Sequence, residues 1–178
     1  TQFKIHKFGG SSLTDAGCIA RVGKIVAGMT DEKIGVVVSA MGGMTDQLLD
    51  LVATVERDDE GFVAALHDIG RRYSDTAAEL VSADGLDSLL HLWSEDAEDI
   101  AENLTAIAVA KAAPQRVRDI IAGYGEIWSA RLLAAHLGQE LGDDRAGTWI
   151  DAREVLTVRY SELGPTVLWE SSKAAFDV

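Results

Sequence analysis

Two short stretches rich in glycine, Gly9–Ser12 and Ser39–Gly43, are the first places where this chain could hold a phosphate or a carboxylate. Glycine lets a backbone come close to a ligand, and free N–H groups at the start of a following helix favour anions. Lys7, just before the first stretch, would place a compact positive charge against a phosphoryl group. Glycine-serine turns are also common as plain connectors, and a strand-end lysine usually stays in water. These residues alone therefore leave both interpretations open.

The known nucleotide-binding motifs are absent from the sequence. It contains neither the P-loop pattern G-x-x-x-x-G-K-[ST] nor the dinucleotide fingerprint G-x-G-x-x-G. The protein-kinase set of H-R-D and D-F-G is missing as well. The histidines lie far apart without the spacing of metal ligands, so no metal site is predicted from them.

Each glycine stretch follows a predicted strand and precedes a predicted helix. Residues 3–8 alternate apolar and polar side chains, and Ile34–Val38 is an apolar run typical of a strand covered on both faces. Apolar residues at helical spacing follow from Asp15 and from about Asp46. The repeated order of strand, loop and helix predicts an α/β fold with a parallel sheet, in which ligands bind at the carboxyl ends of the strands.

The middle of the chain is purely helical in pattern. Apolar residues keep a three-four spacing on both sides of a break at residues 82–85, which predicts a helical hairpin over residues 61–107 inserted in the α/β layer. A long helix is predicted over residues 116–140, a third strand over residues 148–151, and a last helix over residues 165–178.

Composition and charge exclude several classes of partner. The 178 residues carry a net charge of −13, which argues against nucleic acid and against anionic membranes. The acidic residues, for example those of residues 95–102, are interpreted as a solvated surface. No apolar run approaches the length of about 20 residues that spans a bilayer. The single cysteine, Cys18, fits a reducing compartment, and we expect a cytoplasmic protein.

Three ordered motifs together are more specific than either loop. Lys7-Phe8-Gly9-Gly10-Ser11-Ser12 is followed by Val37-Val38-Ser39-Ala40 and later by Gly123-Tyr124-Gly125-Glu126. This set resembles the aspartokinases of the amino-acid kinase superfamily, most closely the kinase portion of a bifunctional aspartokinase–homoserine dehydrogenase. The resemblance implies a three-layer αβα sandwich with a mainly parallel sheet. Residues 1–178 would be the N-terminal, amino-acid-binding part of the catalytic domain, without the nucleotide-binding half and the regulatory domains.

The resemblance also implies roles for particular residues. Lys7 would be catalytic and would contact the transferred phosphoryl group, with the backbone of Gly9, Gly10 and Ser11 around the phosphates. Ser39 and Thr45 would line the aspartate site, and Glu126 would pair with the α-ammonium group of the substrate. For two of these residues a simpler interpretation stays open: Thr45 could only cap a helix, and Glu126 could be an ordinary exposed glutamate.

The activity that the resemblance implies is ATP-dependent phosphorylation of the L-aspartate β-carboxylate. ATP would act with Mg²⁺, most of its site would lie outside this chain, and the full-length protein would be a homo-oligomer. We expect the 178-residue chain to be inactive alone. Two alternatives remain: another amino-acid kinase, of the glutamate 5-kinase or acetylglutamate kinase type, and a non-catalytic α/β binding module.

Overall fold

The structure is a computed structural model that describes residues 4–30, 33–57, 61–142, 147–162 and 164–176. The chain divides into two compact units, residues 1–147 and residues 148–178.

The first unit contains a pair of parallel strands. Strand β1, Lys4–Phe8, pairs with strand β2, Ile34–Val38, with Lys7 opposite Val37. Both predicted strands are present, although residue 3 lies outside the described part of the chain. The expectation that β2 is covered on both faces is wrong for this structure, because Val37 is 49% exposed and Ile5 of β1 is 63% exposed. The described helices thus leave apolar side chains of this sheet uncovered.

Each strand leads through a loop into a helix. After β1, the 3-10 helix η1, Gly10–Ser12, precedes helix α1, Ala16–Ala27. After β2, helix α2 spans Met44–Glu56 and buries Leu48, Val52 and Val55 as its apolar spacing predicted. The predicted order of strand, glycine loop and helix, twice over, is therefore confirmed.

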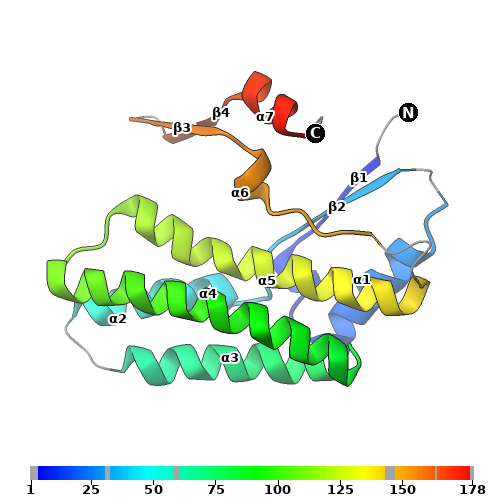
Figure 1. Cartoon of the computed structure of the whole chain (residues 1–178), viewed down its shortest axis with the longest axis horizontal. Coiled ribbons are helices and arrows are strands. Elements are labelled where there is room, and N and C mark those ends of the chain that lie inside the picture. Colours follow the sequence, from blue (N-terminus) through cyan, green and yellow to red (C-terminus); the bar gives the residue numbers. More distant parts are fainter. Residues whose placement is uncertain (1–3, 31–32, 58–60, 143–146, 163, 177–178) are drawn as a thin grey trace. The chain divides into compact units, whose positions relative to one another are not determined.

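Helices α3, Phe62–Ala78, and α4, Ala83–Ala110, form the predicted hairpin (Figure 1). Ser82 begins α4, and its side chain accepts a hydrogen bond from the Gly85 amide at 3.3 Å. The long helix α5, Gln115–Leu141, packs against α1, α2 and α4 and also reaches β2. Both hairpin helices also pack on α2, so α2 and α5 together join the hairpin to the strand-loop-helix layer.

Aromatic side chains fill the contact between α5 and the hairpin. Trp128 of α5 is 1% exposed, and its ring lies about 6 Å from three others: those of Tyr73 (5.9 Å), Trp93 (6.0 Å) and Tyr124 (6.2 Å). Aromatic pairs with such centroid distances and tilted planes stabilise the fold beyond the contribution of their buried apolar area. Burial in this cluster raises the pKa of the Tyr73 hydroxyl, so it stays neutral.

The second unit corrects the sequence prediction in two places. Residues 148–151 form no strand, and the strands are instead β3, Val158–Ser161, and β4, Gly164–Val167, paired in antiparallel fashion. The last helix, α7, spans Trp169–Phe176 and so begins four residues later than predicted, while residues 177–178 lie outside the described part. A strand needs a hydrogen-bonding partner as well as suitable residues, and local pattern does not reveal the partner.

A short helix opens this unit. Helix α6 spans Ala152–Val155, and Asp151 caps it by accepting a hydrogen bond from the Arg153 amide at 2.9 Å. The same carboxylate forms an ion pair with the Arg153 side chain at 2.7 Å. Ser172 of α7 accepts a hydrogen bond from the Thr157 amide at 2.9 Å, which ties α7 to the residue preceding β3.

Candidate functional site

The first loop is a tight turn at the carboxyl end of β1. The amides of Ser12 and Leu13 donate to the carbonyls of Gly9 and Gly10 at 2.9 and 3.0 Å. Leu13 is fully buried and anchors the turn. Lys7 is exposed, and a methyl group placed on Gly9 would lie 3.9 Å from the Lys7 Nζ. The ammonium group therefore lies beside the glycine turn, where the sequence predicted a phosphate.

The second loop lies at the carboxyl end of β2. The Ser39 amide donates to the Phe8 carbonyl at 3.0 Å and continues the pairing of the strands, while Met41 and Met44 are buried. Gly43 precedes α2 with a φ of +76°, a backbone conformation that residues with a Cβ rarely adopt. Because Gly43 is the residue that caps α2, Thr45 lies within the first turn of the helix. The interpretation of Thr45 as the helix cap is therefore wrong.

The two loops are in direct contact. A Cβ on Gly10 would lie 3.1 Å from the Ala40 carbonyl oxygen, and a Cβ on Gly42 would lie 2.9 Å from the Thr14 Oγ1. The Thr14 hydroxyl also lies 3.3 Å from the Gly10 carbonyl and 3.2 Å from the Ser11 carbonyl, to which it can donate. Small residues are thus required on both sides for the loops to approach so closely.

Helix α5 packs against the second loop at Gly125. A Cβ at this position would lie 2.8 Å from the Ala40 Cβ and 3.3 Å from the Met44 Cγ. Ala40 adjoins Ser39, and Met44 adjoins Thr45. The next residue, Glu126, is half-buried rather than fully exposed. The close packing at Gly125 therefore carries Glu126 to the neighbourhood of the second loop.

The predicted site residues thus come from three segments that the fold brings together. Lys7, Gly9, Gly10 and Ser11 belong to the first loop region, Ser39 and Thr45 flank the second loop, and Glu126 follows the glycine that packs on it.

One part of the anion-binding prediction needs correction. The N-terminus of α1 is already capped by the side chain of Asp15, which accepts a hydrogen bond from the Cys18 amide at 2.8 Å. This hydrogen bond lowers the pKa of the Asp15 carboxyl group, so the helix start carries its own anion. The start of α2 has no such side-chain cap. Anion binding at the start of a helix is therefore better supported at the second loop than at the first.

Arg72 of α3 is a residue that the sequence analysis missed. Its Nη2 donates to the Gly42 carbonyl at 2.7 Å and to the Thr14 carbonyl at 3.3 Å, and its Nη1 donates to the Gln47 Oε1 at 2.8 Å. The preceding residue, Arg71, instead forms an exposed ion pair with Asp68 of its own helix. The available signal was helical phase, because Arg72 lies three residues after the buried Ile69.

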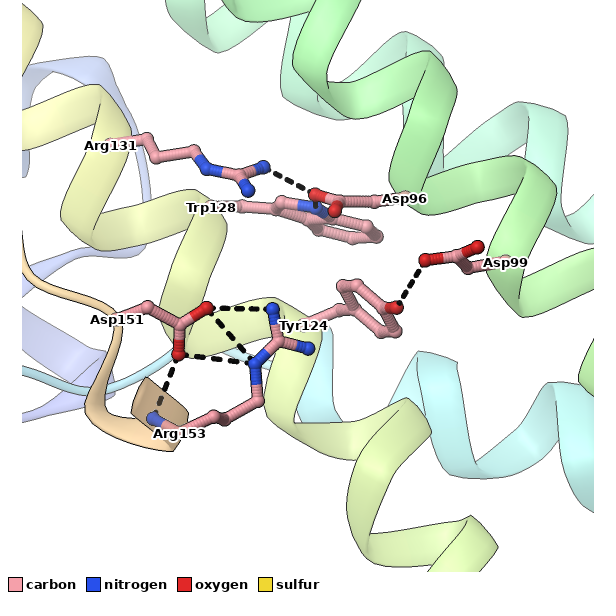
Figure 2. A network of polar contacts seen from close by, with 7 residues as sticks. All are labelled: Asp96, Asp99, Tyr124, Trp128, Arg131, Asp151 and Arg153. Carbon is pink, nitrogen blue, oxygen red and sulfur yellow. Dashed lines mark hydrogen bonds and ion pairs between the residues drawn. The ribbon is translucent and has the colours of Figure 1, made fainter. Parts of the chain in front are cut away.

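A second missed feature is a buried polar network between α4 and α5 (Figure 2). Asp96 is 7% exposed, accepts a hydrogen bond from the Trp128 Nε1 at 2.8 Å, and forms an ion pair with Arg131. Nearby, the Tyr124 hydroxyl donates to the Asp99 carboxylate at 3.2 Å. Asp96 was assigned to a solvated acidic surface, and that interpretation is wrong for this residue. The network fixes the helix that carries Glu126.

Among the described residues, the donor side chains are not grouped as a magnesium site would require. Within the residues that the structure describes, no group of three or more His, Cys, Asp or Glu side chains is placed to hold a metal ion.

The loops that follow the carboxyl ends of the two parallel strands touch each other, and a lysine lies beside one of them. This arrangement defines an α/β domain suited to anionic ligands. The chain belongs to the amino acid kinase family, whose sequence profile matches residues 2–162. The family predicted from the three motifs is thereby confirmed.

Curated relatives refine this membership. The chain is 36% identical over 154 residues to the chloroplastic bifunctional aspartokinase/homoserine dehydrogenase 1 of Arabidopsis thaliana, a match that covers 86% of this chain and 17% of that protein. It is 34% identical over 153 residues to the bifunctional aspartokinase/homoserine dehydrogenase 2 of Escherichia coli, which covers 86% of this chain and 18% of that protein. The chain therefore spans less than a fifth of the length of these relatives.

Solved structures show the same fold. Aspartokinase III of E. coli in complex with lysine and aspartate superposes with a TM-score of 0.80 at 22% identity, over 97% of this chain and 36% of that one. The same enzyme in complex with aspartate and ADP gives a TM-score of 0.77. This chain therefore has the fold of the part of aspartokinase III on which it superposes.

Proposed function

We propose that this chain is the amino-acid-binding part of an aspartokinase catalytic domain. In the full-length enzyme, meaning this chain joined to a nucleotide-binding half, the γ-phosphoryl group of ATP passes to the β-carboxylate of L-aspartate. The product is 4-phospho-L-aspartate, at the first step of the lysine, threonine and methionine pathway. The observation that carries the proposal is the direct contact of the two loops, in a chain similar to aspartokinases along most of its length.

The first loop serves the phosphoryl group. An oxygen of the β-carboxylate attacks the γ-phosphorus, the bond to the bridging oxygen breaks, and ADP leaves. Such a transfer needs positioning and charge stabilisation rather than a covalent nucleophile. Lys7 supplies the positive charge, and the turn formed by Gly9, Gly10 and Ser11 lets the phosphates approach the backbone.

The second loop and α5 serve the amino acid. Ser39 and Thr45 offer hydroxyl groups to the substrate beside a helix start that has no side-chain cap. The Glu126 carboxylate pairs with the α-ammonium group of aspartate. A partly buried carboxylate is favourable when such a cation accompanies it. Because Ala40 and Gly10 touch, the amino acid and the phosphoryl group would meet where the two loops join.

The remaining parts of the enzyme complete both the fold and the site. The exposed apolar side chains of β1 and β2 support a wider sheet in the full-length enzyme, which would give the three-layer sandwich with a mainly parallel sheet. ATP would bind with Mg²⁺ largely outside residues 1–178, and the enzyme would be a homo-oligomer. The relatives named above support a fusion to homoserine dehydrogenase. No helix in the described ranges is long and apolar enough to cross a membrane.

A phosphoryl-transfer assay of the full-length enzyme tests the proposal. Aspartate, glutamate and N-acetylglutamate are each supplied with ATP, and the acyl phosphate is trapped with hydroxylamine. We expect product with aspartate only. Product with glutamate or N-acetylglutamate instead would identify another amino-acid kinase, and no product with any acceptor would favour a non-catalytic module.

A further inference from the structure

We propose that Arg72 is a positioning residue that holds the phosphate-facing loop and the amino-acid-facing loop at a fixed separation. The inference rests on the proposed function for its chemistry, whereas the bridge between the loops is a matter of structure. It gives the helical hairpin a part in aligning the reaction, although the hairpin contributes none of the predicted site residues.

The geometry of the guanidinium group carries the inference. Its Nη2 reaches one carbonyl on each side, that of Thr14 after the first loop and that of Gly42 within the second. Its Nη1 reaches the side chain of Gln47 on α2. A planar fork of donors can serve several acceptors at once, which a lysine ammonium at the end of a flexible stem cannot do with the same geometry.

The helix that carries Arg72 is itself held firmly. The neighbouring Tyr73 is 1% exposed and packs against Trp128 of α5. Arg72 is half-buried, and its hydrogen bond to the Gly42 carbonyl is partly shielded from water, whereas the longer one to the Thr14 carbonyl is exposed. Helix α3 thus holds the Arg72 guanidinium group against the two glycine-rich loops.

Fixed separation matters because the two loops would hold the two reactants. Thr14 lies within hydrogen-bonding distance of the carbonyls of Gly10 and Ser11, so a shift of Thr14 moves the predicted phosphate contacts. Gly42 precedes the start of α2 and Thr45. A misplacement of about 1 Å between reacting groups lowers the rate on the order of a hundredfold.

The first experiment needs no catalytic activity. Amide hydrogen exchange is measured by NMR in the 178-residue chain for the wild type, Arg72→Ala and Arg72→Lys. Arg71→Ala is the matched control, because this adjacent arginine pairs with Asp68 on the surface. We expect the amides of Leu13 and Met44 to exchange about tenfold faster or more in Arg72→Ala, the scale of losing charge-assisted hydrogen bonds. Arg72→Lys should show the same change in part, and exchange in α4 should not change.

The second experiment uses the full-length enzyme. Arg72→Ala should lower kcat about a hundredfold, with smaller changes in the KM for aspartate and for ATP, while Arg71→Ala should match the wild type. Guanidinium ions, added far below denaturing concentrations, should restore part of the lost kcat in Arg72→Ala.

Several results would overturn the inference. These are unchanged exchange at Leu13 and Met44, equal loosening of α4, wild-type exchange in Arg72→Lys, and a normal kcat in Arg72→Ala. If the wild-type enzyme does not phosphorylate aspartate, the proposed function fails, and amide exchange alone then decides whether Arg72 bridges the loops.

Discussion

Lys7 is the residue with the most direct predicted part in the chemistry. Its side chain is exposed, as a solvated strand-end lysine would be, but its ammonium group lies beside Gly9. Exposure alone therefore does not separate the two interpretations. A kinetic measurement does, because a group that stabilises developing charge affects the transition state more than the bound substrates.

In the full-length enzyme, Lys7→Ala should lower kcat on the order of a hundredfold or more, with much smaller changes in both KM values. Lys7→Arg should not restore the rate, because a broad guanidinium group replaces a compact charge between glycines. Lys4→Ala, at another exposed lysine of β1, is the control for strand stability. Circular dichroism must show that each variant is folded. A folded Lys7→Ala enzyme with near-normal kcat would assign the glycine loop to scaffolding.

Glu126 should act on one substrate only. Glu126→Gln removes the charge that pairs with the α-ammonium group of aspartate, a contact worth about 1.5–3 kcal/mol. The KM for aspartate should rise by about ten- to a hundredfold, and that for ATP should change little. Steady-state kinetics with each substrate varied measures the difference, with Glu140→Gln on the exposed end of α5 as the control. Equal changes in both KM values would return Glu126 to an ordinary helix position.

At the scale of elements, the position of α5 decides whether Glu126 can reach the site. Two kinds of contact fix this helix: the close packing of Gly125 on Ala40, and the ion pair of Arg131 with Asp96 of α4. The buried ion pair is more sensitive to mutation than a surface pair, because removing one partner leaves a charge in a poorly solvated place.

Asp96→Ala should therefore destabilise the chain by about 3–5 kcal/mol. The same change at Glu98, which is exposed on α4, should stay within about 0.5 kcal/mol. Urea unfolding followed by tryptophan fluorescence measures both, since Trp128 is hydrogen-bonded to Asp96. A loss for Asp96→Ala no larger than that for Glu98→Ala would show that the network contributes little.

Glu56 links the end of α2 to the start of α5 and should make this link sensitive to acid. Its carboxylate forms an ion pair with Arg118 and accepts a hydrogen bond from the Ala113 amide at 3.0 Å. The hydrogen bond from Arg118, followed by that from Ala113, lowers the pKa of Glu56 below its usual value of 4.5. A carboxyl group with a lowered pKa in the folded state stabilises it above the unfolded pKa, and this contribution is lost as the pH falls through the folded value.

Glu56→Gln should therefore lower the urea midpoint at neutral pH. The difference from the wild type should shrink as the pH falls below about 4.5. Glu102→Gln, at an exposed position of α4, is the control and should show no such convergence. A constant difference at all pH values would mean that the charge of Glu56 does not contribute.

At the scale of the whole molecule, the chain covers only 17% of the Arabidopsis relative and 36% of the E. coli aspartokinase III chain. The residues predicted to bind the amino acid are present, whereas the nucleotide site is proposed to lie mostly outside residues 1–178. The purified 178-residue chain should therefore form no aspartyl phosphate from aspartate and ATP above the level of its Lys7→Ala variant. Hydroxylamine trapping measures the product, and activity above that control would place the nucleotide site within this chain.

The sequence by itself determined the two parallel strands, the glycine loops and the helical hairpin, because these depend on local periodicity and turn residues. Ile34–Val38 was predicted at its observed bounds, and the motifs around Lys7, Ser39 and Glu126 led to the right family. The local sequence pattern gave a wrong prediction where a strand needs a partner strand. Residues 148–151 have the composition of a strand but no strand forms there, whereas Val158–Ser161 pairs with Gly164–Val167.

Only the tertiary structure decided which polar side chains reach across elements. In the sequence, Asp96 and Arg72 resemble the charged surface residues beside them. In the structure, Asp96 is buried against Arg131, and Arg72 bridges Thr14 and Gly42. Helical phase limits the direction of a side chain, but its partner lies tens of residues away. The packing of α3 on α2 and of α4 on α5 brings these partners close. Contacts of this range depend on how the helices pack together, and no local pattern records them.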